Sequence, residues 1–429
     1  MDSEAKHTLL LILLAILSIN CLGCKKESTG HSQNFDHRHK PEGVIEIRHE
    51  SIQPNTSIVL DSILDTVYYV ALETNDSCLI GRIDEIVVTE DRIFIMDINQ
   101  TESIYIFDRL GRYLASISRK GKGPGEYMQP ADITISEVRN EIYLLNEFPS
   151  KIIVYNFYGE YLREIILPFR FSSFAFIDDG SFVFINEPNC RKYGNPPARI
   201  NKIYSNLYYI SEDGSSFEGG GPIQTAFEEN IISNGHFGLM KNHEIIYHPL
   251  FNDTIFEIRN SESFPLLVVE FKDLSINIQE VAGLDRDKFL KVCEENGYYY
   301  IDGHYNHTRE FITFTIRSVK EDAGYITIYN RQNGNHMTFL TWHSTIFNPC
   351  NLLARTSWRE YFISIITSPD VMTIKHAFEN HSDIPDNILV FTPPDKLLQD
   401  INENSNPILC FYKLRPEKIN MESVFLAEE

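Results

Sequence analysis

Short apolar runs, separated by polar turn residues, recur along most of the chain. Residues 104–114 contain an apolar run, an Asp, two residues, a Gly and, one position on, Tyr-Leu; residues 152–162 repeat this order 48 positions later with Asn in place of Asp. An Asp or Asn side chain can hydrogen-bond to its own backbone and Gly accepts a positive φ, so both favour a tight turn between two strands. The repeat therefore predicts two equivalent β-hairpins.

Two further short apolar segments precede each hairpin. They are residues 86–88 and 93–96 before the first hairpin, and residues 133–135 and 142–145 before the second. Each unit therefore holds four short strands in about 48 residues, which is the size of one β-propeller blade. Ile93–Met96 is apolar without alternation. That pattern is expected of a strand that neighbouring blades cover on both faces.

Later segments continue the pattern more loosely. The strands expected in the third to sixth units are residues 174–176, 182–185 and 207–210; 237–239, 244–247, 253–258 and 266–271; 311–316, 325–329 and 337–340; and 361–366, 371–374 and 408–414. Asp61–Leu414 spans 354 residues, or 59 for each of six blades. Six blades therefore leave room for insertions, whereas seven would not.

Two insertions and a closing strand complete the predicted architecture. Leu284–Gly297, with Asp285 as its candidate cap, and Pro393–Ile401 are expected to form short helices. Thr66–Leu72 is expected to pair with Ile408–Leu414, which would close the ring and remove exposed strand edges. The sequence therefore predicts an all-β protein: a six-bladed β-propeller with four-stranded antiparallel blades and short helical insertions.

The N-terminal segment has the pattern of a targeting signal. Leu9–Leu17 is an unbroken run of nine apolar residues after Lys6. A membrane-spanning helix needs about 20 apolar residues, so this run is typical of a signal-peptide core. It leads to Cys21-Leu22-Gly23-Cys24. A redox or zinc pair is the alternative, but zinc would need a second Cys-x-x-Cys motif, which the chain lacks. The segment resembles the lipobox of bacterial lipoproteins, and this resemblance implies that Cys24 is lipidated.

Four regions follow from these assignments. We expect a lipoprotein signal peptide at 1–23, a lipidated N-terminus and polar tether at 24–60, the propeller at 61–416 and a C-terminal tail at 417–429. His31, His37 and His39 lie close together in the tether, but no Cys or carboxylate stands at a ligand spacing from them. A flexible tether is therefore favoured over a metal site. The five cysteines after Cys24 are widely scattered, which favours single buried thiols over a disulfide framework.

The charge of the chain excludes one class of partner. The sequence has 43% hydrophobic residues, and its 60 acidic and 38 basic residues give a net charge of −22. A chain this acidic is repelled by phosphate backbones, so nucleic-acid binding is not expected. The membrane, reached through the N-terminal lipid, and a glycan, peptide or protein ligand remain as expected partners.

A glycine-rich element at residues 119–127, Arg-Lys-Gly-Lys-Gly-Pro-Gly-Glu-Tyr, connects the first two units. It lacks the spacing of a Walker-type phosphate loop, and no helix signal follows it. A tight turn, in which Pro fixes one φ and Gly residues supply unusual ones, is the favoured interpretation. Such a connection is expected at the mouth of the central funnel. Lys122, Glu126 and Tyr127 are therefore the candidate ligand-binding residues.

The glycine-rich element also carries a family resemblance. Its Gly-x-Gly-Pro-Gly-Glu-Tyr core resembles the hallmark of six-bladed β-propeller lipoproteins common in Bacteroidetes, a family of unknown function that is similar in architecture to NHL-repeat propellers. Residues 250–256, Leu-Phe-Asn-Asp-Thr-Ile-Phe, and 406–409, Asn-Pro-Ile-Leu, match further. The resemblance covers about Val44–Pro416. It implies the fold and an envelope location, as an outer-membrane lipoprotein facing the periplasm or the cell surface, and brings no catalytic residues.

Candidate chemistry elsewhere is sparse. His304 and His307, with Asp302 nearby, could ligate a metal, but surface histidines in a polar loop are the favoured interpretation. No Gly-x-Ser-x-Gly, His-Glu-x-x-His or calcium-loop motif occurs, and we predict no catalytic residue, metal or cofactor. The leading hypothesis is a binding or scaffold module for a glycan, peptide or protein. The alternative is an envelope hydrolase or lyase acting on carbohydrate or peptide in the propeller funnel.

Overall fold

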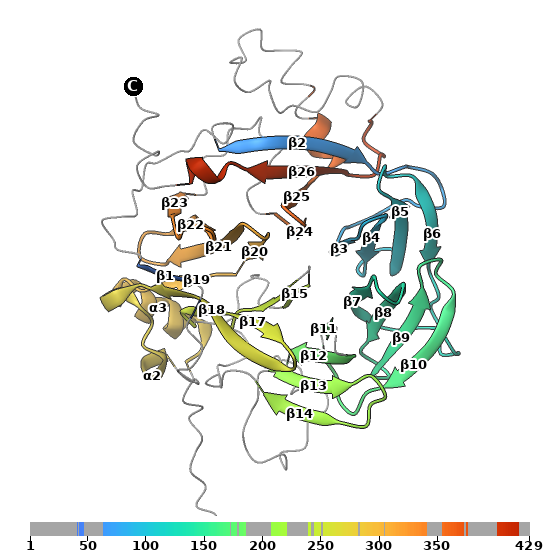
Figure 1. The fold of residues 1–429 in the computed structure, drawn as a ribbon, viewed down its shortest axis with the longest axis horizontal. Coiled ribbons are helices and arrows are strands. Elements are labelled where there is room, and N and C mark those ends of the chain that lie inside the picture. The colour runs from blue at the N-terminus through green and yellow to red at the C-terminus, as the bar shows by residue number, and fades with distance from the viewer. Residues whose placement is uncertain are drawn as a thin grey trace, which may run out of the picture. The chain divides into compact units, whose positions relative to one another are not determined.

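The computed structural model describes residues 41, 43–46, 63–171, 173–177, 180–185, 207–220, 239–241, 244–249, 252–281, 284–303, 305–340, 354–372, 375 and 401–419. All of them belong to one compact unit, Lys40–Glu429. Within it, six small sheets, antiparallel except for one added strand, are arranged as a ring (Figure 1). The predicted fold class, a six-bladed β-propeller, is confirmed.

The first three blades each have four strands that follow one another along the chain. Blade one contains β3 (Glu85–Val88), β4 (Arg92–Asp97), β5 (Ser103–Asp108) and β6 (Tyr113–Ile117). Blade two contains β7 (Pro130–Ser136), β8 (Glu141–Asn146), β9 (Lys151–Asn156) and β10 (Tyr161–Ile166). Blade three contains β11 (Phe174–Ile177), β12 (Ser181–Ile185), β13 (Leu207–Ser211) and β14 (Phe217–Gly220). The first strand of each blade lies nearest the ring centre (Figure 1).

The next two blades carry additional strands. Blade four contains β15 (Leu239–Lys241), β16 (Ile245–Tyr247), β17 (Thr254–Arg259) and β18 (Glu262–Glu270), with β1 (Gly43–Glu46) outside β18. Blade five contains β19 (Tyr299–Ile301), β20 (Asn306–His307), β21 (Phe311–Ser318), β22 (Ala323–Asn330) and β23 (His336–Leu340). Both β19 and β20 pair with β21, so together they form an interrupted inner strand.

Strand β1 differs from the expectation of a polar tether up to residue 60. Gly43–Glu46 pairs in parallel with residues 267–270 of β18. Ile45 is 2% exposed and packs in the core between blades four and five. Gly43 is needed at this seam, because a Cβ there would lie 2.0 Å from the hydroxyl oxygen of Tyr329. Four residues of the stretch assigned to the tether are therefore part of the propeller.

Blade six closes the ring as predicted. It contains β24 (Thr356–Trp358), β25 (Tyr361–Ile366), β26 (Ile408–Leu414) and β2 (Leu64–Ala71), with β2 outermost. β2 pairs antiparallel with β26, from Leu64 opposite Leu414 to Ala71 opposite Ile408. Distant parts of the chain therefore share one sheet, and the predicted pairing is confirmed.

The strand predicted at residues 371–374 is wrong. Residues 368–372 are helical, and residues 373–374 lie outside the described part of the chain. The Thr367 amide donates to Asp370 Oδ2 at 2.8 Å, and the Asp370 amide donates to Thr367 Oγ1 at 3.4 Å. This reciprocal pair is a capping box, which starts a helix. The innermost strand of blade six is instead β24.

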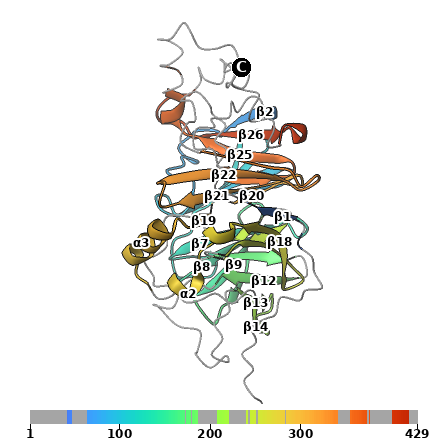
Figure 2. The same cartoon turned by 90° about the vertical axis from the view of Figure 1, so that its left-hand side faces the viewer.

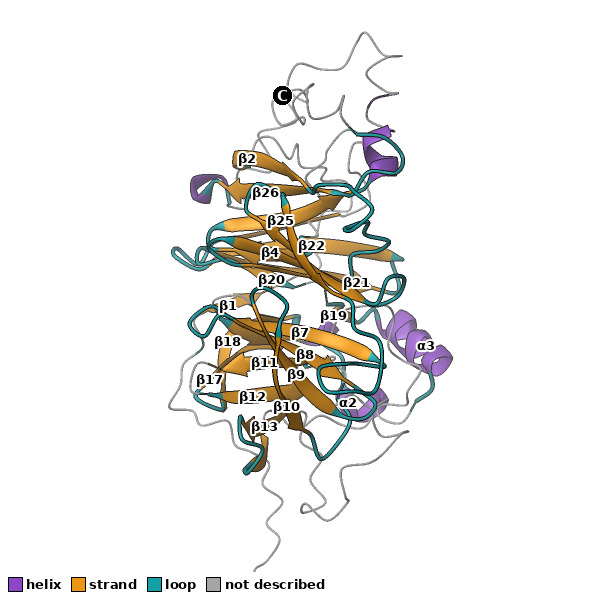
Figure 3. Cartoon of the chain, turned by 90° about the vertical axis from the view of Figure 1, so that its right-hand side faces the viewer, coloured by secondary structure: helices purple, strands orange, loops and turns teal. Residues whose placement is uncertain are grey.

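One predicted helix is confirmed. Helix α3 (Arg286–Asn296) has Asp285 as its N-cap, whose side chain accepts from the Lys288 amide, and Gly297 ends it with a left-handed φ of 67°. The short helix α2 (Ile278–Val281) precedes it. Figures 2 and 3 show α3 projecting from the side of the ring beside β19. In the second predicted helix, residues 393–400 lie outside the described residues.

Buried cores between successive blades explain the unalternating apolar strands. In β4, Ile93 and Ile95 pack in a cluster with Phe411 of blade six, whereas Phe94 and Met96 pack in a cluster with Ile133 of blade two. All four β4 side chains are at most 1% exposed. Burying one such side chain contributes about 1.5–3 kcal/mol to stability. Because alternate side chains of β4 enter different cores, the strand helps to hold its blade against both neighbouring blades.

Candidate functional site

The glycine-rich element is a tight turn between β6 and β7. Gly125 has a φ of +72°, as expected for at least one of its glycines. The Gly123 amide donates to Glu126 Oε2 at 2.8 Å, so the carboxylate caps the turn from within. Lys120 and Tyr127 form an isolated parallel bridge that closes the base of the turn. The Glu126 side chain is thus engaged in holding the element together.

The element lies over the outer strands of blade two, whereas the sequence interpretation placed it at the funnel mouth. The Gly125 amide donates to Glu164 Oε1 of β10 at 2.9 Å, and the Tyr155 hydroxyl of β9 donates to the Gly125 carbonyl at 2.8 Å. β9 and β10 are the two strands of this blade farthest from the inner strand β7. The element directly follows β6, the outermost strand of blade one, and it is held in this outer position by residues 30 and 39 positions away, which the local sequence does not reveal.

The three candidate side chains of this element have different environments. Tyr127 is 1% exposed, and its hydroxyl lies 2.5 Å from the Glu102 carbonyl and 3.0 Å from the Ile117 carbonyl. Burial raises its pKa to about 12. A ligand therefore cannot reach Tyr127 without opening the core. Lys122 is exposed and Glu126 is half-buried.

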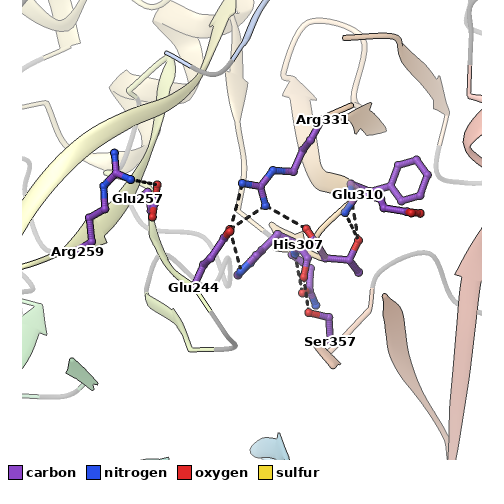
Figure 4. A network of polar contacts seen from close by, with 10 residues as sticks. Glu244, Glu257, Arg259, His307, Glu310, Arg331 and Ser357 are labelled. Carbon is purple, nitrogen blue, oxygen red and sulfur yellow. Dashed lines mark hydrogen bonds and ion pairs between the residues drawn. The ribbon is translucent and has the colours of Figure 1, made fainter. Parts of the chain in front are cut away.

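A second polar group joins blades four, five and six, and we call it the seam cluster: Glu244, His307, Arg331 and Ser357 (Figure 4). Arg331 Nη1 donates to Glu244 Oε2 at 2.8 Å, and His307 Nε2 lies 4.0 Å from the same oxygen. The Ser357 hydroxyl donates to the His307 carbonyl oxygen. Three blades are therefore linked through the backbone and side chains around His307.

His307 corrects the interpretation of a surface histidine in a polar loop. It belongs to β20, pairs with Ile312 of β21 and is 0% exposed. The interrupted inner strand places it between neighbouring blades, so it is enclosed although its sequence neighbours are polar. His304 lies outside the described residues, as do Cys24 and the three histidines expected in the tether.

The seam cluster leaves one carboxylate partly accessible. The Glu244 side chain is 26% exposed, whereas that of Arg331 is 11% exposed. Arg331 also donates to the Thr308 carbonyl at 3.2 Å. The guanidinium is therefore held on two sides, and the cluster can fix the blades and present the Glu244 carboxylate. Sequence reasoning missed this pair because its members are 87 residues apart.

Two further titratable groups flank the connection between β16 and β17. His248 is 0% exposed, and burial lowers its pKa to about 4, opposed by its contact with the Asn252 carbonyl at 2.6 Å from Nε2. Burial raises the pKa of Asp253 to about 6, opposed by the Ser275 hydroxyl, which donates to Oδ2 at 3.0 Å. Burial therefore favours the neutral form of both groups.

The cysteines that the structure describes do not assemble a site. Cys78, Cys293 and Cys410 are free and buried, and burial raises the pKa of Cys293 to about 12. Across the described ranges, no three His, Cys, Asp or Glu side chains are grouped so as to hold a metal ion. Among the described helices, none has the length and apolar character to cross a membrane.

Comparison with known proteins supports the fold and identifies the family. A protein of Bacteroides fragilis, named for its expected export, is 19% identical, with 87% of this chain and 99% of that chain covered at a TM-score of 0.65. A member of the DUF4221 family from Bacteroides vulgatus is 12% identical, with 82% and 97% covered at a TM-score of 0.47. No curated protein matches the chain. A family model matches residues 42–413, and the chain therefore belongs to the domain family of unknown function DUF4934.

Proposed function

We propose that this chain is an envelope-anchored lipoprotein whose propeller is a binding or scaffold module for a glycan, peptide or protein partner. The anchoring part of the proposal rests on the Cys21–Cys24 segment and the apolar run before it. The similar Bacteroides fragilis protein, named for its expected export, supports the same location. Lipid on Cys24 would keep the propeller at the membrane.

Ring closure is the observation that carries the binding part of the proposal. β2 pairs with β26 along its length, so segments that are far apart in sequence complete one blade. A closed ring presents its turns and strand ends in fixed positions. A preformed surface loses little conformational entropy when a ligand binds, which favours recognition by rigid contacts. The seam cluster adds a further restraint, because Arg331 joins Glu244 of blade four to blade five.

A binding array with product analysis tests this function. The full-length chain is applied to immobilised glycans and peptides, and each bound compound is then incubated with the chain and analysed for products. Binding without conversion supports a binding module. Conversion of a bound compound would contradict the scaffold interpretation and support the hydrolase or lyase alternative. The Cys24→Ala variant is the matched control, because it removes the lipidation site and should bind the same compounds.

A further inference from the structure

Strand β1, which we call the strap, connects the N-terminal part of the chain to the outer edge of blade four. Gly43–Glu46 pairs with Leu267–Glu270 of β18, which lies far along the sequence. The pairing is parallel, so a tight hairpin cannot produce it. The strap therefore reaches β18 from a distant part of the chain, and its own residues have to specify where it docks.

Two residues of the strap fit this edge closely. Ile45 is 2% exposed and packs in the core that blades four and five share. A Cβ on Gly43 would lie 2.0 Å from Oη and 2.6 Å from Cζ of Tyr329. Tyr329 is 3% exposed and belongs to the same core, so its ring has no room to move aside. The docking site therefore requires Gly and Ile at these two positions of the strap.

The strap also has a defined direction. Because the pair is parallel, it begins beside Leu267 and ends beside Glu270. At its end, Glu46 Oε2 lies 2.8 Å from Nζ of Lys272, in the turn directly after β18. Residues that precede the strap therefore join the propeller at the outer edge of blade four.

Without the strap, the N-terminal part of the chain would first join the ring at blade six. Ile63 is 2% exposed and directly precedes β2, the outermost strand of that blade. Figure 1 shows β1 beside β18 and β2 beside β26, at separate places on the rim of the ring. Gly43 and Ile63 follow Cys24 by 19 and 39 residues. An extended chain covers at most about 3.5 Å per residue, so docking shortens the maximum reach from Cys24 from about 135 Å to about 65 Å.

From these observations we infer that the strap sets which side of the anchored propeller faces the lipid surface. It moves the attachment point of the lipid-bearing N-terminus from blade six to the outer edge of blade four, and it thereby turns the edge of blade four toward the membrane. This inference rests on the proposed lipid on Cys24. It goes beyond the anchor by naming the part of the propeller that lies next to the membrane.

Two strap variants and one matched control test the inference in the full-length chain. Gly43→Val places a branched side chain against Tyr329, and Ile45→Ser removes the buried apolar side chain, so each should release the strap. Val44→Ser is the control on the same strand, because Val44 is 55% exposed. Hydrogen exchange of residues 43–46 reports whether the strap is docked, and melting temperatures report whether the ring stays folded.

Photocrosslinking to lipid measures which edge of the ring faces the membrane. The photoreactive residue p-benzoylphenylalanine replaces either Glu262, at the start of β18 in blade four, or Asp65, in β2 of blade six; both residues are exposed. The lipidated chain is bound to vesicles of phosphatidylethanolamine and phosphatidylglycerol that contain an alkyne-bearing phospholipid. Lipid attached to the protein after illumination is then detected through the alkyne.

With the strap docked, we expect more lipid crosslinking from position 262 than from position 65. The effective concentration of a tethered site falls roughly as the −3/2 power of linker length, so lengthening the linker from 19 to 39 residues should lower crosslinking at position 262 about threefold. Both strap variants should show this loss and a gain at position 65, whereas Val44→Ser should show neither.

Three results would overturn the inference: equal crosslinking from the two positions, unchanged crosslinking after the strap is released, or continued protection of residues 43–46 from exchange in both strap variants. The comparison of the two positions needs no strap variant, so it decides the question even for a variant that does not fold. The proposed anchoring fails separately, when the unmodified chain takes up no fatty-acid label.

Discussion

Replacing Gly125 with Ala tests whether the glycine-rich element is architectural. An added Cβ would lie 2.7 Å from Cγ and 2.8 Å from Cδ2 of the Tyr161 ring, both closer than carbon atoms pack. The φ of +72° adds a backbone cost of about 1–2 kcal/mol for a residue with a Cβ. Crowding a packed ring typically costs a further 1–3 kcal/mol, so we expect a loss of about 3 kcal/mol in the free energy of unfolding.

Thermal unfolding measures this loss. For a propeller of roughly 350 residues, the average unfolding entropy per residue converts about 3 kcal/mol into a fall of about 4 °C in melting temperature. Denaturant titration provides a second measurement, since an unchanged slope with a lower midpoint indicates lost stability rather than a different unfolded state.

Gly123 supplies a matched control in the same element. Its φ is not in the positive range, and a Cβ would first meet Glu126 Oε2 at 3.1 Å, which is the end of a flexible side chain. Gly123→Ala should therefore cost less than about 1 kcal/mol. Equal melting temperatures for the Gly125→Ala variant and the parent would refute the reasoning about this turn. A loss of ligand binding in Lys122→Ala, with stability intact, would instead assign the element a binding role.

Three other perturbations test separate parts of the molecule. Cys24→Ala should abolish labelling by a fatty-acid analogue and release the chain from membranes, whereas Cys21→Ala should leave both unchanged; continued labelling of the first variant would contradict lipidation there. Asp253→Asn should raise stability above pH 6 by up to about 3 kcal/mol and change little below pH 4, because the raised folded pKa makes the carboxylate destabilising as pH rises through about 6. Urea titrations at pH 4 and 7.5 measure this difference, and an equal effect at both pH values would contradict it. Truncation after Asn404 removes β26 and should cause aggregation, because β2 and β25 lose the strand between them. A truncated chain that stays monomeric in light scattering, with an unchanged melting temperature, would argue against closure by this sheet.

Much of the fold could be predicted because its signals are local and repeated. The hairpin glycines Gly111 and Gly159 have φ values of 80° and 78°, as their shared turn pattern implies. Asp285 and Gly297 mark the ends of α3 through a side-chain cap and a left-handed C-cap. The pairing of β2 with β26 could be predicted for a different reason. One apolar strand is left over near each end of the propeller sequence, and pairing the two in one sheet is what closes the ring.

The remainder depends on contacts between distant residues. Arg331 and Glu244 meet because blades four and five are neighbours, and neither residue stands in a motif. His307 is buried because β20 continues the inner strand of blade five beside β21. The interruption between β19 and β20 makes the sequence around His307 look like a polar loop. The capping box at Thr367 and Asp370 was a readable helix signal, but the apolar residues after it also fit a short strand. Local pattern alone therefore misassigned that segment.

Some conspicuous polar residues of the blades serve the same structural purpose at equivalent positions. Asp97 accepts hydrogen bonds from the amides of residues 81 and 82, at 2.9 and 3.0 Å, in the connection before β3. Asn146 accepts from the amides of residues 128 and 129, both at 2.9 Å, in the connection before β7. Both polar side chains are 0% exposed. They satisfy backbone donors that would otherwise be buried without partners.

This repetition indicates where a binding function can reside in such a ring. A polar residue that recurs from blade to blade and bonds to the connection beside it stabilises every blade alike, so it cannot distinguish one ligand from another. Recognition needs features that differ between blades and remain accessible. Within the described residues of blades one and two, Leu110 and Tyr158 occupy the same turn position with different side chains, and Val138 lies at a neighbouring turn. The shared turn geometry holds these side chains in place, and their variation makes the exposed surfaces of the two blades different.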